Sequence, residues 1–207
     1  ILRARDLDFD RVIDPASYFN TYNKTIRKIS EYEASKGKDS YSQTLTGYTY
    51  VTYASYYIQN NQPFNAIGRG MDALKMFRKV KKKYSTNYDI DFLLGLYNYT
   101  KAELRKKFWF VLFWFPGSKK RGLESIERCS EKGTFTRLVA KMSLIDIYNM
   151  NEETEKSEKL TDSLLVCYPK SRFILWSKVR YFEKEKKYKK CAETYEILSN
   201  SYQKTKY

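Results

Sequence analysis

The pattern of apolar and polar side chains predicts helices along the whole chain. Apolar residues recur at three- and four-residue spacing over long stretches, and only eight glycines and four prolines interrupt them. In the first stretch, Asp14 is suited to cap a helix that begins at Pro15, and Gly37 is suited to end it. This stretch predicts an N-terminal helix within residues 1–38.

The tyrosine-rich residues 47–57 have the composition of a strand. However, Tyr50, Ala54 and Tyr57 fall at helical spacing, and the stretch lacks a clean inside/outside alternation, so we assign it to a helix. We therefore expect an all-α fold of about nine helices, joined by short turns and without a sheet. The helices after the first are expected near residues 40–60, 63–84, 89–115, 117–131, 134–150, 152–168, 171–186 and 188–204.

The last two helix pairs are related by a constant shift along the sequence, 182 − 148 = 34. Three of four compared positions keep a size and polarity suited to helix packing, and the fourth does not. The matching pairs are Tyr148 with Phe182, Ser157 with Cys191 and Leu164 with Leu198, and the mismatch is Leu144 with Lys178. In an earlier pair, small residues stand where two helices must approach closely, namely Ala54 in one helix and Ala66, Gly70 and Ala73 in the next.

This pattern resembles the tetratricopeptide repeat (TPR), in which large and small residues alternate over a helix pair and a proline follows. Leu175 and Trp176 stand at its early large position, and Pro169 closes the preceding unit. Cys191 and Ser157 replace the usual alanine. Non-repeating helical bundles are the alternative. The resemblance implies one domain over residues 1–207, with an N-terminal helix at 1–38 and repeats at 40–84, 89–131, 134–168 and 171–204.

The second of these repeats contains an insertion. Gly95 and Gly122 suit the two small positions of a helix pair, but their separation in the sequence, 122 − 95 = 27, exceeds the 12 of the family. About fifteen extra residues are therefore expected, in "KKFWFVLFWFPGSKK" or nearly so, and the first helix would extend through Phe115.

Three interpretations of the inserted aromatic run remain open. Residues 108–115 can fold back as an apolar plug of the core, form a docking surface for a partner protein, or enter a membrane surface while basic side chains bind anionic head groups. Eight apolar residues are too few to span a bilayer. The residues of this possible docking or membrane patch are Phe108, Trp109, Phe113, Trp114, Lys119, Lys120 and Arg121.

The resemblance implies a right-handed α-α superhelix that binds protein segments along the concave face formed by the first helix of each pair. Proteins of this kind are usually adaptors rather than catalysts, so we expect a non-catalytic scaffold with a protein or peptide partner and no cofactor. Such a mixed polar and aromatic face suits a peptide with charge and one apolar anchor. Carried over position by position, the concave residues are Met142, Asp146, Asn149, Trp176, Arg180 and Glu183.

The charge of the chain supports a second function class. Lys and Arg number 39 against 24 Asp and Glu, a net charge of +15, which favours an acidic partner, nucleic acid or an anionic membrane surface. The basic clusters at residues 77–84 and 184–190 are expected either to form solvated helix ends or to contact phosphate or acidic peptide. The alternative function is therefore a basic helical-repeat protein that binds nucleic acid or an anionic membrane.

Catalysis is the third possibility, and few residues favour it. The absence of histidine excludes an imidazole base or ligand, and the three cysteines are expected to be small core residues. Asp89 and Asp91, ahead of a helix, are interpreted as N-capping residues. The chain begins at Ile1, so any targeting region would precede it, and both the cytoplasm and the periplasm or cell envelope remain open.

Overall fold

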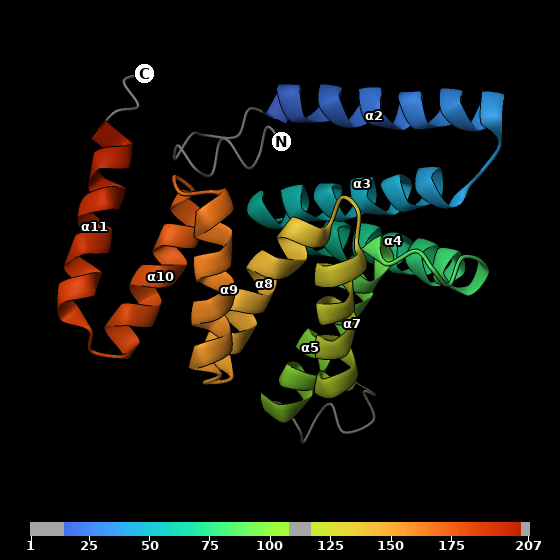
Figure 1. The fold of residues 1–207 in the computed structure, drawn as a ribbon. Coiled ribbons are helices and arrows are strands. Elements are labelled where there is room, and N and C mark those ends of the chain that lie inside the picture. Colours follow the sequence, from blue (N-terminus) through green and yellow to red (C-terminus); the bar gives the residue numbers. More distant parts are fainter. Residues whose placement is uncertain (1–14, 108–116, 204–207) are drawn as a thin grey trace. The chain divides into compact units, whose positions relative to one another are not determined.

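The computed structural model describes residues 15–107 and 117–203, and these ranges form nine helices and no strand (Figure 1). The prediction of an all-α fold is therefore confirmed for them. The helices are α2 (Pro15–Lys36), α3 (Ser40–Gln59), α4 (Pro63–Lys83), α5 (Asp89–Lys107), α7 (Lys119–Lys132), α8 (Arg137–Met150), α9 (Thr154–Cys167), α10 (Arg172–Lys184) and α11 (Tyr188–Gln203).

Local signals in the sequence set several helix ends. α2 begins at Pro15 and stops before Gly37, which has φ of +81° and donates its backbone N–H to Glu33 O at 2.9 Å. The expected cap Asp14 lies outside the described residues. At the start of α3, the Asp39 carboxylate accepts from Ser42 N at 2.7 Å, and this hydrogen bond lowers the pKa of Asp39.

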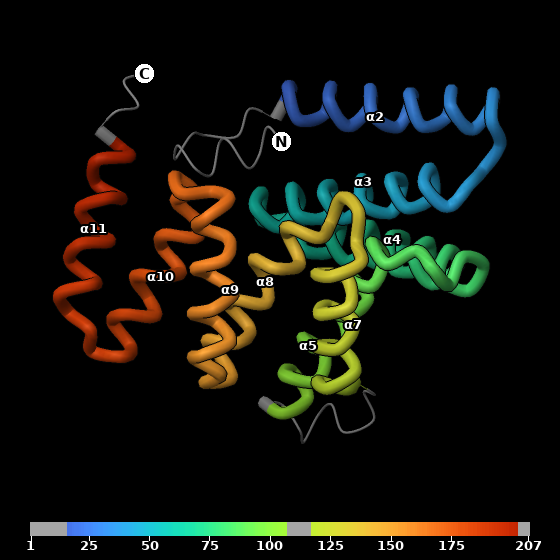
Figure 2. Tube along the Cα trace, viewed as in Figure 1, coloured from blue at the N-terminus to red at the C-terminus, as the bar shows by residue number. Residues whose placement is uncertain are grey.

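The described chain forms two compact units, residues 15–137 and residues 138–203, which we call the N-terminal unit and the C-terminal unit. In the N-terminal unit, α3 packs against α2 and α4, and α5 packs against α4 and α7 (Figure 2). In the C-terminal unit, α10 packs against α9 and α11. Packing between helices that are close in sequence is compatible with a helical repeat. The single domain over residues 1–207 stays a prediction.

The helices α5 and α7 approach each other most closely at two glycines. A Cβ atom on Gly95 would lie 2.7 Å from the carbonyl oxygen of Gly122, and one on Gly122 would lie 2.6 Å from Tyr99 N. The prediction that these glycines occupy the small positions of one pair is confirmed. The expectation for Gly70 is wrong, because a Cβ atom there would meet nothing within 4 Å.

In the C-terminal unit, positions related by the repeat shift have matching environments. The three pairs that the shift matched, listed above, are all buried. Ser157 shows why a small residue is needed, since its hydroxyl lies 3.4 Å from the carbonyl oxygen of Ile145 in the neighbouring helix. The mismatched pair differs in the structure as well: Leu144 is buried, whereas Lys178 forms an ion pair with Asp162 at 2.6 Å.

The cysteines only partly follow their prediction. Cys129 and Cys191 are buried, as expected for small core residues, but Cys167 is exposed at the last position of α9. Helical periodicity could not distinguish the exposed cysteine from the buried ones. Cys167 ends an apolar run, Leu164, Leu165 and Val166, that suggests burial, but Val166 is itself exposed at this helix end.

We expect Gly122→Ala to lower the free energy of unfolding by about 2 kcal/mol or more, because backbone atoms that cannot move aside crowd the new methyl group. The matched control is Gly70→Ala in α4. There the methyl group meets open space, so alanine should raise stability by about 0.5 to 1 kcal/mol through its helix propensity. Urea unfolding followed by circular dichroism measures both. Equal effects of the two substitutions would contradict the close packing of α5 on α7.

Candidate functional site

The residues predicted for the concave face come from α8 and α10 of the C-terminal unit. In each helix the three residues follow one another at four- and three-residue spacing, which places them on one side of the helix. These residues are Met142, Asp146 and Asn149 in α8, and Trp176, Arg180 and Glu183 in α10.

Arg180 and Asp146 are brought together by the fold. Arg180 Nη2 lies 3.0 Å from Asp146 Oδ1, and the side chains are 52% and 43% exposed. The same nitrogen is 2.9 Å from Ser177 Oγ, which helps to fix the guanidinium in place. The pair joins α8 to α10 across a separation of 34 residues, which equals the period found in the sequence. Since both side chains are about half exposed, the contact itself adds little stability.

Trp176 and Glu183 lie against α11 instead. The Trp176 ring meets the Tyr195 ring edge-on, with 5.7 Å between centroids, and its Nε1 lies 3.4 Å from Tyr202 Oη. Tyr195 Oη donates to Glu183 Oε1 at 2.9 Å, and this hydrogen bond raises the pKa of Tyr195. The six predicted residues therefore divide between an α8/α10 contact and an α10/α11 contact.

The remaining two predicted residues are less open to solvent. Met142 is partly buried and packs against the apolar cluster of Ile145, Leu164 and Ile174. Among the described residues, the Nδ2 atom of Asn149 has no hydrogen-bond partner and is buried, although the residue as a whole is partly exposed. An unpaired buried donor costs about 1–3 kcal/mol.

Lys184 belongs to the same surface, although the sequence pattern did not single it out. Its Nζ atom donates to the carbonyl oxygen of Asn149 at 3.1 Å and lies 4.0 Å from Glu152 Oε1. Lys184 also opens the basic cluster at 184–190, for which the sequence left open a solvated helix end or a contact with phosphate or acidic peptide. The one-turn offset from Arg180 is the signal that could have placed it on this face.

Together these side chains form a mixed surface, which we call the α8/α10 face. It presents an exposed guanidinium, an ammonium group and a carboxylate beside a Trp176 side chain that is 37% exposed. Arginine and tryptophan are the residue types that contribute most in protein interfaces. The surface offers hydrogen-bonding and apolar contacts.

The second predicted patch is only partly described. Its aromatic members Phe108, Trp109, Phe113 and Trp114 lie outside the described residues. Lys119, Lys120 and Arg121 form the first turn of α7, where Ser118 Oγ caps the helix by accepting from Arg121 N at 3.2 Å. The Lys119 ammonium lies 2.9 Å from Glu103 Oε1, a contact that raises the pKa of Lys119. None of the helices described is both long and apolar enough to cross a membrane.

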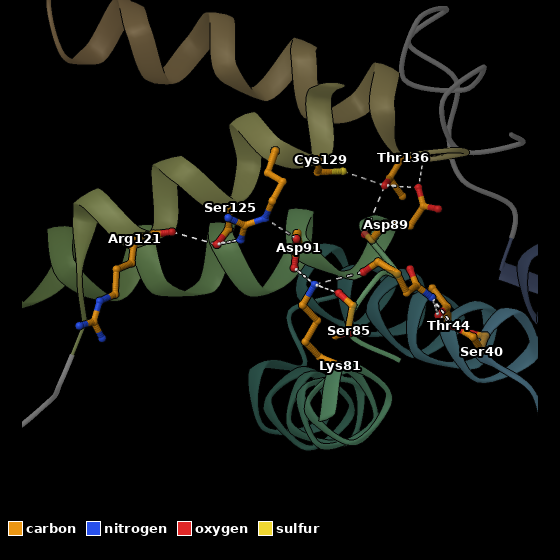
Figure 3. Close-up of polar contacts among 12 residues, drawn as sticks. Ser40, Thr44, Lys81, Ser85, Asp89, Asp91, Arg121, Ser125, Cys129 and Thr136 are labelled. Carbon is orange, nitrogen blue, oxygen red and sulfur yellow. Dashed lines mark hydrogen bonds and ion pairs between the residues drawn. The ribbon is translucent and has the colours of Figure 1, made fainter. Parts of the chain in front are cut away.

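Asp89 and Asp91 were interpreted from the sequence as N-capping residues. Asp89 does act as a cap, but for the segment before α8 and not for its own helix α5. Its Oδ1 atom accepts from the consecutive backbone amides of residues 134, 135 and 136 at 2.9, 3.0 and 2.9 Å. The Thr136 hydroxyl donates to the same atom at 2.7 Å and also contacts the buried Cys129 (Figure 3).

Asp91 is held between two cations. Lys81 Nζ from α4 lies 2.8 Å from its Oδ1 atom, and Arg128 Nε from α7 lies 2.9 Å from its Oδ2 atom (Figure 3). The Asp91 side chain is only 3% exposed. The Asp91 carboxylate therefore joins three helices and the Asp89 carboxylate joins α5 to the segment before α8, so both have structural contacts. In the described ranges, no group of three or more Cys, Asp and Glu side chains could hold a metal ion.

Comparisons with protein-family models, with curated proteins and with solved structures found no match to this chain.

We expect Asp91→Asn to lower the free energy of unfolding by about 2 to 3 kcal/mol, because it leaves two cations facing a neutral amide in a buried site. The control is Asp162→Asn, which removes the exposed partner of Lys178 and should cost less than about 1 kcal/mol. Chemical unfolding of both variants tests this. If both cost the same, the buried contact is not a main support of the N-terminal unit.

Proposed function

We propose that the protein is a non-catalytic interaction scaffold, built of TPR-like helix pairs in a right-handed superhelix, that binds a segment of another protein on the α8/α10 face. The observation that carries this proposal is the contact between Asp146 and Arg180, two positions separated by one repeat period.

The first support for the proposal is the relation between equivalent positions of successive helix pairs. In a stacked array, the same position of successive units comes together, because each unit packs on the next with the same geometry. Asp146 and Arg180 occupy one such position in α8 and α10. Ser157 in α9 and Cys191 in α11 are also one period apart, and both are buried. First helices that lie next to each other form a continuous face.

The chemistry of the face then indicates the class of partner. Arg180 and Lys184 can bind a carboxylate, and Arg180 can exchange its contact with Asp146 for a bidentate one because both side chains are accessible to solvent. Trp176 offers an apolar surface beside them. A segment with an acidic residue near one apolar side chain is complementary to this arrangement.

Panning a peptide-display library on the whole chain tests the proposal. We expect enriched peptides that combine an acidic and a bulky apolar residue, and we expect Arg180→Ala or Trp176→Ala to weaken their binding about tenfold or more. Titration calorimetry with the enriched peptides measures the change. The exposed position of Arg180 makes its replacement compatible with folding.

Lys178→Ala provides the matched control, because Lys178 is on α10 as well but pairs with Asp162 of α9. It should leave peptide affinity unchanged. If no peptide is enriched, or if all three variants bind the peptides as the unchanged chain does, the α8/α10 face is not a binding surface.

A further inference from the structure

The hairpin of α3 and α4 contains a long stretch without charge. From Ser40 to Gly68 there is no acidic or basic side chain, although charged residues make up 30% of the chain. This stretch covers all of α3, the turn after it and the first residues of α4. The turn at residues 60–62, with the adjoining ends of both helices, is called the hairpin tip below.

Apolar side chains project from this tip into solvent. Ile58 is 65% exposed, Phe64 is 86% exposed and Ile67 is 62% exposed. These values are high for large apolar residues that gather at one end of a helix pair, and such gatherings usually mark a contact with a partner or a membrane. The tip therefore needs an apolar environment that the described residues do not supply.

The outer side of α4 changes character along its length. Its buried side packs through Ala66, Ala73, Phe77 and Val80. On the opposite side, exposed residues follow at three- and four-residue spacing in one stripe of roughly 27 Å at 1.5 Å per residue. The stripe is apolar near the tip and basic beyond it. Its members are Phe64, Ile67, Met71, Lys75, Arg78 and Lys82.

The helix α5 extends the basic end of the stripe. Arg78 Cζ lies 5.7 Å from the centroid of the Tyr97 ring, and Lys101 Nζ from α5 lies 5.4 Å from the same centroid. Both cations therefore lie around one half-buried tyrosine. No acidic side chain is within ion-pair distance of Arg78 in the described part of the chain, so its charge is available to an anionic surface.

The turn at the tip is also suited to an environment with little water. Its three backbone amides are satisfied within the hairpin: Asn60 N donates to Tyr56 O at 3.1 Å, Asn61 N to Ile58 O at 3.2 Å, and Gln62 N to Tyr57 O at 2.9 Å. The next residue, Pro63, has no N–H group. Since an unsatisfied amide is costly in lipid, a turn with internal hydrogen bonds can enter the membrane interface at low cost.

We propose that the tip of the α3/α4 hairpin inserts into the surface of an anionic lipid bilayer, with Ile58, Phe64 and Ile67 in the interface and Lys75, Arg78 and Lys82 on the lipid head groups. The apolar side chains enter first, and the cations reach the phosphate level because they follow along the same stripe. This surface is distinct from the α8/α10 face and does not depend on the proposed scaffold function.

The details favour lipid over the other anionic partners. A nucleic acid would use the cations but would leave the aliphatic side chains of Ile58, Ile67 and Met71 without contacts. An acidic protein helix could use the basic end of the stripe, but it would find no cation to pair with at the tip, because residues 58–68 carry no charge. A bilayer favours such an uncharged tip, because charged side chains are expelled from its apolar region.

A fluorescent label at the tip tests the insertion directly. Phe64→Cys in a Cys167→Ser background leaves one exposed thiol for an environment-sensitive dye, because Cys129 and Cys191 are buried. With vesicles of phosphatidylcholine and phosphatidylglycerol, we expect a blue shift of the dye and quenching by brominated acyl chains. The control carries the dye at Val166→Cys in the same background, a position on α9 that is 84% exposed, and should show neither change.

Charge reversal tests the basic end of the stripe. In a co-sedimentation assay, the triple variant Lys75→Glu, Arg78→Glu and Lys82→Glu should bind these vesicles with an affinity lower by about tenfold or more. A control with equal net charge, Lys159→Glu, Lys170→Glu and Lys189→Glu, alters exposed lysines of the C-terminal unit and should lose much less. Circular dichroism confirms that each variant is folded.

Four outcomes would overturn the proposal. The unchanged chain could fail to pellet with anionic vesicles, or it could pellet without any response of the dye at position 64. Equal losses in the two triple variants would assign the binding to net charge alone. If an acidic amphipathic peptide changed the dye signal and vesicles did not, the stripe would be a protein-binding surface instead.

Discussion

The N-terminal unit depends on the hydrogen bonds made by Asp89. One carboxylate oxygen of Asp89 accepts hydrogen bonds from three consecutive backbone amides before α8. The backbone carbonyl oxygen of Asp89 accepts a hydrogen bond from Tyr48 Oη of α3 at 2.7 Å. Because backbone amides buried without acceptors are costly, this turn needs an acceptor, and Asp89 fixes it against α3 and α5. Asp91, two residues later, attaches α4 and α7 to the same helix. Two acidic residues thus set the relative positions of most helices in this unit.

This use of acidic side chains inside the N-terminal unit has a consequence for its surface. Asp89 accepts backbone amides and Asp91 pairs with Lys81 and Arg128, so neither carboxylate is left to pair with the cations on the outer side of α4. The stripe that begins at Phe64 therefore ends in a basic surface around Tyr97. The C-terminal unit is different, since Asp146 remains accessible beside Arg180 and gives the α8/α10 face both signs of charge. The two surfaces are consequently suited to different partners.

Much of the fold could be predicted from the sequence because its signals are local. Pro15, Gly37 and the spacing of apolar residues placed the helices within a few residues of their observed ends, except for the end predicted at Phe115, which lies outside the described residues. The repeat shift predicted shared burial in the last two helix pairs, and Gly95 with Gly122 predicted a close approach. The site was harder to predict. Arg180 contacts Asp146, one repeat period before it, whereas Trp176 and Glu183 lie against tyrosines of α11 that helical spacing could not pair with them.

The sequence by itself determined where the helices begin and end and which of their sides are apolar, because capping and periodicity act within a few residues along the chain. Only the tertiary structure decided what each polar group contacts. Asp89 looked like a cap for its own helix, yet it binds amides of the distant segment before α8, and Gly70 looked like a packing position, yet it faces open space. The reason is physical: a hydrogen bond or a close approach depends on the distance between atoms in the folded chain, and helical spacing specifies that distance only within one helix.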